Sequence, residues 1–152
     1  MMNIDATMAV KAFLLIALTV FPVQASFAQS TDPDAPTVLA EGIIEEMNSS
    51  RMSEDNSYYY AFDVHKGTLS LTLDLMPTNR SDGGGLLQWT LLNSKFEKLK
   101  YDNLSASSSP ERQMKDMPVT IKRRIILKIV VAGNVRYKIK LSGSAVNFSG
   151  TK

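Results

Sequence analysis

Two stretches of this chain alternate apolar and polar residues without a break. Residues 68–75 read TLSLTLDL, and residues 135–141 read VRYKIKL. Successive side chains of a β-strand point to opposite faces, so a period of two predicts strands with one buried face and one exposed face. The side chains expected inside are Leu69, Leu71, Leu73, Leu75, Val135, Tyr137, Ile139 and Leu141.

The same alternation runs through residues 57–67, SYYYAFDVHKG, where it separates neighbouring aromatic residues. One strand face would carry Tyr58, Tyr60, Phe62 and Val64, and the other Tyr59, Ala61, Asp63 and His65. Lys66-Gly67 predicts a turn, and Pro77 the end of the next strand.

Residues 86–93, LLQWTLLN, have apolar residues on both faces and predict a central strand. Residues 96–101 indicate a shorter strand, and residues 43–47 fit either a first strand or one helical turn. The stretches 78–85 and 105–112 are rich in Gly, Ser and polar residues and are expected to be loops.

Residues 125–131 are rich in β-branched residues and are followed by Ala-Gly-Asn and the alternating stretch 135–141. This order predicts a β-hairpin. Several short strands separated by turn residues favour an antiparallel, jelly-roll-like β-sandwich, which we place at residues 43–146 with a tail at 147–152.

The N-terminus predicts export. Residues 12–23, AFLLIALTVFPV, form an apolar run of 12 residues. This is shorter than the roughly 20 that a membrane-spanning helix needs, and it fits a secretory signal better than an uncleaved anchor. We expect cleavage after Ala28, or alternatively after Ala25, and no stable membrane span afterwards. The alternative start at Met8 gives a cleaner signal. Residues 29–42 contain Pro33 and Pro36 and predict a flexible leader. The mature chain is expected to be secreted or periplasmic.

The absence of cysteine excludes disulfides, thiolate zinc sites and a cysteine nucleophile. The single histidine, His65, shares a strand face with Asp63, but no G-x-S-x-G motif accompanies it, so we interpret His65 as an exposed residue and expect no enzyme activity. A strand follows the glycines at 83–85, whereas a phosphate-binding loop needs a helix. No cofactor is predicted.

Residues 54–75, EDNSYYYAFDVHKGTLSLTLDL, resemble the start of bacterial pre-peptidase C-terminal (PPC) domains, which have an acidic loop, a D-x-Y-x-F strand, a glycine turn and an alternating strand. The matching positions are Asp55, Tyr58 or Tyr59, Tyr60, Phe62, Gly67 and Leu69 to Leu75. Residues 86–99 resemble that family's middle strand and turn, and residues 120–143 are similar to its closing hairpin.

The resemblance, over about residues 41–143, implies a non-catalytic β-sandwich of the kind appended to secreted proteases or other exported enzymes. Such domains serve in secretion, stability or the binding of polymers such as collagen or glycans. Here no catalytic domain accompanies it, so this would be a stand-alone copy. No DxDxDG-type loop is present, and no calcium ligands are inferred.

The net charge of +2 hides a polarity along the chain. Residues 112–152 hold ten Lys or Arg and one acid, whereas residues 29–65 hold eight Asp or Glu and one Arg. Arg136, Lys138 and Lys140 would share one strand face, where they could meet an anionic polymer, a glycan or lipid headgroups. The alternative is a solvated face that pairs with the acidic strand or protects a sheet edge.

Tyr59 and Trp89 are the candidates for surface stacking on a sugar. Together these patterns predict an exported, non-catalytic module that binds a polymer, a glycan or a protein partner. A structural partner of another exported protein, docked through a sheet edge or the basic face, is the alternative, and a hydrolase is a third. An exported chain is not expected to bind nucleic acid.

Overall fold

The computed structural model describes residues 29–51, 56–78 and 83–148, and every regular element in them is a β-strand. The predicted signal segment lies outside these residues. Within the described ranges, no helix is long and apolar enough to cross a membrane. The strands are β1 Thr37–Val38, β2 Ile43–Ser49, β3 Asn56–Val64, β4 Gly67–Pro77, β5 Gly85–Leu92, β6 Lys98–Ala106, β7 Glu111–Val119 and β8 Arg123–Ser142.

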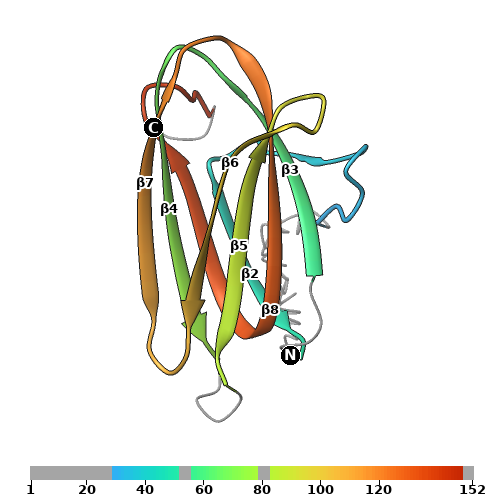
Figure 1. Cartoon of the computed structure of the whole chain (residues 1–152), viewed down its shortest axis with the longest axis vertical. Helices are drawn as coiled ribbons and strands as arrows, with labels where there is room; N and C mark the ends of the chain where they lie inside the picture. The colour runs from blue at the N-terminus through green and yellow to red at the C-terminus, as the bar shows by residue number, and fades with distance from the viewer. Residues whose placement is uncertain (1–28, 52–55, 79–82, 149–152) are drawn as a thin grey trace, which may run out of the picture.

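The strands build an antiparallel β-sandwich, which confirms the predicted fold class (Figure 1). We call its two layers the A sheet, with the strand order β1-β3-β8-β5-β6, and the B sheet, with the order β2-β8-β4-β7. Of the strands in the described ranges, only the short β1 runs parallel to its neighbour, β3. From β2 to β8 the chain changes sheet at each connection except the β5–β6 hairpin, which makes the topology jelly-roll-like.

Strand β8 belongs to both sheets, and it corrects the predicted hairpin. Residues 123–133 pair with β3 and β5 in the A sheet, whereas residues 134–142 pair with β2 and β4 in the B sheet. The chain turns at the lower end of the molecule in Figure 1, at Gly133, whose φ is +89°. The Ala-Gly-Asn signal therefore does reverse the chain. The two halves face each other across the core instead of pairing edge to edge.

A buried asparagine holds this bend. Asn48, on β2, is 3% exposed. Its Nδ2 donates hydrogen bonds to the Gly133 carbonyl oxygen at 2.7 Å and to the Ser50 Oγ at 2.9 Å. Its Oδ1 accepts one from Asn56 Nδ2 at 2.7 Å. Because a buried amide needs its partners, these bonds tie β2 and the start of β3 to the bend of β8.

The core lies between the sheets, and the alternation predicted its members. All eight side chains expected inside from residues 68–75 and 135–141 are at most 3% exposed. Leu127 and Ile129 of β8 join them at 0% exposure. Burial of this many large apolar side chains is the main stabilising contribution available to a domain without disulfides.

The strand prediction missed β7 and placed β6 too early. Phe96 lies in the β5–β6 loop rather than in a strand, and residue 111, predicted as loop, begins β7. Among the described strands β7 pairs only with β4, so it is an edge strand with a mostly exposed, charged sequence. That position also explains how the strand accommodates Pro118, since proline in a sheet is confined to edges and bulges.

The sandwich extends beyond the predicted 43–146 on both sides. The Tyr59 amide donates to the Ser30 carbonyl oxygen at 2.8 Å, and the Leu39 amide donates to the Ala61 carbonyl oxygen at 2.9 Å. Part of the expected leader therefore lies along β3. In the expected tail, the ring of Phe148 packs on the core, and its centroid lies 6.3 Å from the ring centroid of Phe62.

Candidate functional site

The basic residues predicted as a candidate face lie together on the outer surface of the B sheet. They occupy alternate positions of β8, between Val135, Tyr137, Ile139 and Leu141, all of which are buried. Arg136 and Lys140 are exposed and Lys138 is half-buried. The strand period that buries one set therefore presents the other to solvent, as expected.

Lys138 belongs to a row of alternating charge that crosses all four strands of the B sheet. The register places it between Glu45 of β2 and Asp74 of β4, and places Arg112 of β7 beside Asp74. Lys138 Nζ lies 3.0 Å from Glu45 Oε2. Arg112 binds Asp74 through two of its guanidinium nitrogens, Nε to Oδ1 and Nη2 to Oδ2, the latter at 3.0 Å. The charge of Lys138 is thus compensated by an acidic neighbour, as in the alternative in which the basic strand pairs with an acidic one.

The ion pair between Arg112 and Asp74 also shifts the pKa values of both groups. The hydrogen bond from the Arg112 guanidinium, with a further contribution from the Lys138 charge, holds the pKa of Asp74 below its usual value. The same contact raises the pKa of Arg112. Both groups stay charged near neutral pH, so the row is a fixed feature of the face.

Arg136 has a different environment. Its cross-strand neighbours are Met47 and Met76, which are 61% and 48% exposed. Lys140 lies between Ile43, 46% exposed, and Thr72. In the described part of the chain, neither Arg136 nor Lys140 forms an ion pair. The face therefore combines two uncompensated cations with exposed aliphatic and thioether side chains.

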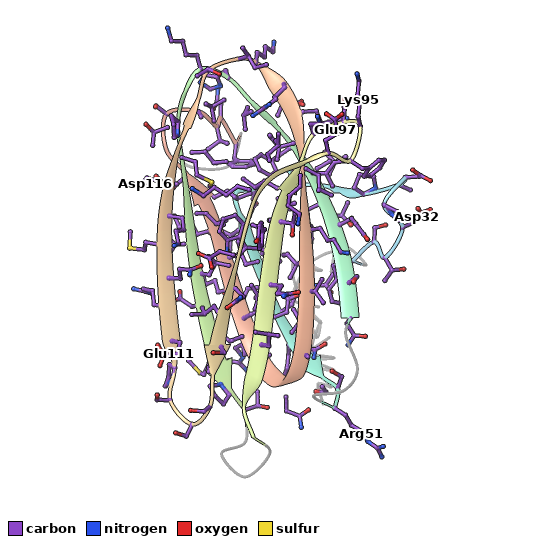
Figure 2. The ribbon with its side chains drawn as sticks, viewed as in Figure 1. Asp32, Arg51, Lys95, Glu97, Glu111 and Asp116 are labelled. Carbon is purple, nitrogen blue, oxygen red and sulfur yellow. The ribbon has the colours of Figure 1, made fainter. Side chains whose placement is uncertain are left out.

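An open groove of about 520 Å³ runs along this face. Its lining comes from β2, β4, β8 and the start of β7 and comprises Glu45, Asp74, Leu75, Met76, Pro110, Glu111, Arg112, Arg136, Tyr137 and Lys138. Figure 2 shows Glu111 near the lower end of the sandwich, far from Lys95 and Glu97 on the β5–β6 loop. The groove brings the guanidinium of Arg136, paired charges and an apolar wall together on one surface.

The other sequence candidates lie elsewhere. Tyr59 lies on the outer face of the A sheet, with Lys128 Nζ 5.8 Å from its ring centroid, so it does not join the basic row. Trp89 was predicted as a surface aromatic, which is wrong. It is 0% exposed in the core, and its Nε1 donates to Gln113 Oε1 at 3.1 Å. Trp89 shares the inward face of a central strand with Leu87 and Leu91.

His65 lies in the turn between β3 and β4, where its side chain is exposed. Its backbone amide donates to the Ala145 carbonyl oxygen at 2.9 Å. Among the described residues, no side chain contacts the His65 imidazole through a hydrogen bond or ion pair. Nor do the described residues bring three or more His, Asp or Glu side chains together as a metal site.

Two tyrosine hydroxyl groups are buried inside the sandwich. Tyr60 and Tyr137 are 3% and 1% exposed, and their pKa values are raised well above the usual 10.0, mainly by burial. The charge of Glu46 contributes to both shifts. Gln29 donates a hydrogen bond from Nε2 to the Tyr137 hydroxyl at 2.9 Å. These tyrosines are structural phenols that stay protonated at neutral pH.

Sequence reasoning missed Glu45, Met47, Asp74, Met76 and Arg112 as members of the face. The period of two placed Asp74 on the exposed side of its strand, whereas residues 43–47 fitted either a strand or a helical turn and Arg112 was expected in a loop. What the sequence did not show was which strands are neighbours, since β8 pairs with β2 and β4 at separations of about 60 to 100 residues. Topology, rather than residue type, brings the groove together.

Comparisons with known proteins leave the family open. No family model matches the chain, and no curated protein matches it. Among solved structures, an arabinose-bound α-L-arabinofuranosidase matches with a TM-score of 0.44 and 13% sequence identity, over 76% of this chain and 21% of that one. A similarity at this level supports no conclusion about activity.

Proposed function

We propose that this chain is an exported, non-catalytic β-sandwich module, similar to PPC domains, that binds a segment of a partner protein on the outer face of the B sheet. Export is supported by the signal-like run at residues 12–23. The observation that carries the binding site is Arg136. It projects without a charge partner among the described residues, between the exposed methionines Met47 and Met76, at an open groove.

The chemistry of the face favours a peptide that places an acidic side chain beside an apolar one. The guanidinium of Arg136 offers paired N–H donors to a carboxylate. Methionine side chains are flexible and polarizable, and they adapt to apolar partners of different shape. None of the outward-facing residues of β2, β4, β7 and the second half of β8 is aromatic. Sugar rings, which pack on aromatic side chains, are therefore a weaker match here.

The test measures binding to an array of synthetic peptides of about twelve residues, each with one Asp or Glu flanked by Leu, Met or Phe. A matched array replaces each acid with its amide. We expect the chain to bind members of the acidic array, and to lose about tenfold or more in affinity as Arg136→Glu, because a like charge then faces the carboxylate. Met76→Ala should weaken the same peptides.

Lys95→Glu is the matched control, since it reverses one exposed charge at the opposite end of the molecule (Figure 2). Its binding should equal that of the unmodified chain. Equal binding of the acidic and amide arrays, or full affinity in Arg136→Glu, would show that this face does not recognise such peptides. Binding should also weaken when salt is raised, because exposed charges are screened.

A further inference from the structure

The outer face of the A sheet carries a second constellation, composed of aromatic rings, lysines and uncharged polar groups. The register aligns Tyr59 of β3 with Lys128 of β8, Lys128 with Thr90 of β5, and Thr90 with Tyr101 of β6. Lys128 and Thr90 alternate with buried core residues, so their side chains lie on the outer face. Tyr59 and Tyr101 are paired directly with them, and paired residues of neighbouring strands share a face. The row spans four strands, which places the backbones of the two tyrosines about 14 Å apart.

Each tyrosine ring has a lysine against it. Lys98 Nζ lies 4.3 Å from the ring centroid of Tyr101, and Lys128 Nζ lies 5.8 Å from that of Tyr59. Tyr101 is 64% exposed, an unusually open position for a ring on a sheet surface. Within the described ranges, neither lysine forms an ion pair, so the face holds two cations whose charge is not balanced by a carboxylate.

Amide side chains lie in the next row. Gln88 and Asn103 face each other across β5 and β6, both exposed. Neither side chain makes a hydrogen bond to another described residue, so donors and acceptors are available beside the rings. Together with the Thr90 hydroxyl, they provide the neutral hydrogen-bonding groups that a polyhydroxylated ligand requires.

The loop between β5 and β6 adds a third ring. Phe96 has a φ of +61°, in the left-handed region that bulky residues rarely adopt. Asn93 holds the loop in this shape, with its Oδ1 accepting from the Lys95 and Glu97 amides at 2.9 and 3.0 Å. The Phe96 side chain is 42% exposed beside a hollow of about 340 Å³ that Val38, Ala61 and Ile126 also line. Such conformations are strained, and they concentrate at functional sites.

We propose that this face binds an acidic polysaccharide. The rings of Tyr59 and Tyr101 would pack against the apolar faces of sugar rings, the amide and hydroxyl groups would bond sugar hydroxyls, and Lys98 and Lys128 would meet the carboxylates. A polysaccharide fits better than a protein segment because this face presents rings and amides on a sheet surface. The exposed methionines lie on the B sheet instead. This proposal does not depend on the peptide-binding groove.

The test is affinity electrophoresis of the folded chain in gels containing polygalacturonate or alginate, with dextran as the neutral probe. We expect strong retardation by the acidic polymers and weak retardation by dextran. Tyr101→Ala should weaken retardation by the acidic polymers at least tenfold, whereas Tyr101→Phe, which keeps the ring, should retain it. Met114→Ala is the matched control, because Met114 is 67% exposed on the outer face of the other sheet.

Because Tyr101 is exposed, its variants should unfold at the temperature of the unmodified chain, and circular dichroism would establish this. Retardation that persists in Tyr101→Ala but disappears at 0.5 M salt would indicate charge attraction alone and would overturn the proposal. The proposal would also be overturned if the chain bound the peptide arrays but no polysaccharide, and if Tyr101→Ala abolished the peptide binding. Such a result would make this face a protein interface.

Discussion

Gly84 offers a sharp test of the structure, because Gly83 beside it is a nearly ideal control. Both residues have left-handed backbone angles, with φ of +82° and +79°. A Cβ at Gly84 would overlap the Ala106 carbonyl oxygen at the end of β6 and lie 2.7 Å from the Ser107 Cα. A Cβ at Gly83 would meet no described atom within 4 Å. Gly83→Ala and Gly84→Ala therefore share the backbone cost and differ in the steric one.

The shared cost of placing alanine in the left-handed region is about 1–2 kcal/mol. Gly84→Ala must also displace the backbone that follows β6, which adds about 1–3 kcal/mol, the range for steric overpacking. We expect Gly83→Ala to lower the free energy of unfolding by about 1 kcal/mol and Gly84→Ala by about 3 kcal/mol or more. At roughly 4 °C per kcal/mol for a domain of this size, the melting temperatures should differ by about 8 °C.

The assay is urea denaturation at pH 7, followed by far-ultraviolet circular dichroism. The dependence of the unfolding free energy on urea should be unchanged, since neither substitution alters the surface exposed on unfolding. If the two variants lose equal stability, the backbone at Gly84, just before β5, does not approach the end of β6 as described. If Gly83→Ala is the more damaging variant, the reasoning is wrong.

Two further predictions concern the interior. The raised pKa values of Tyr60 and Tyr137 mean that the folded chain holds these protons more tightly than the unfolded chain, so the free energy of unfolding should be full below pH about 10 and fall as the pH rises further. Urea denaturation at pH 8 and 11 should show a smaller fall in the double variant Tyr60→Phe/Tyr137→Phe, whereas Tyr101→Phe should lose as much stability as the unmodified chain. Asn48→Ala should lower the free energy of unfolding by about 2–3 kcal/mol, because it leaves the Gly133 carbonyl and the Asn56 side-chain amide without their partner. Asn103 is exposed, so Asn103→Ala should change this free energy by less than about 0.5 kcal/mol, and equal effects of the two substitutions would contradict the role of Asn48 at the bend.

Local pattern was enough to predict the strands with one buried face. Residues 68–75 and 135–141 place every predicted core side chain correctly, because strand periodicity depends only on the chain's own geometry. The same pattern separated Tyr59 from Tyr60 and put Arg136 on the surface. It failed for β7, whose edge position leaves most of its side chains exposed and removes the apolar signal.

Long-range pairing could not be predicted in the same way. The sequence signals a reversal at Gly133, but a hairpin within one sheet and a bend between two sheets need the same turn residues. Which of the two forms depends on whether other strands, here β2, β3, β4 and β5, occupy the edges of both halves. The groove around Arg136 and the tyrosine row both depend on that outcome, so neither was visible as a constellation before the topology was known.

The sharing of β8 between both sheets has a consequence for the order of events during synthesis. This strand pairs directly with β2, β3, β4 and β5, yet it is the last of the described strands to leave the ribosome. Until it emerges, the earlier strands can form only fragments, such as β4 with β7 and β5 with β6. Contacts this distant in sequence also make folding slow. A chain exported as we propose would therefore remain unfolded long enough to be threaded through a membrane, with its leucine-rich β4 in need of a chaperone on the way.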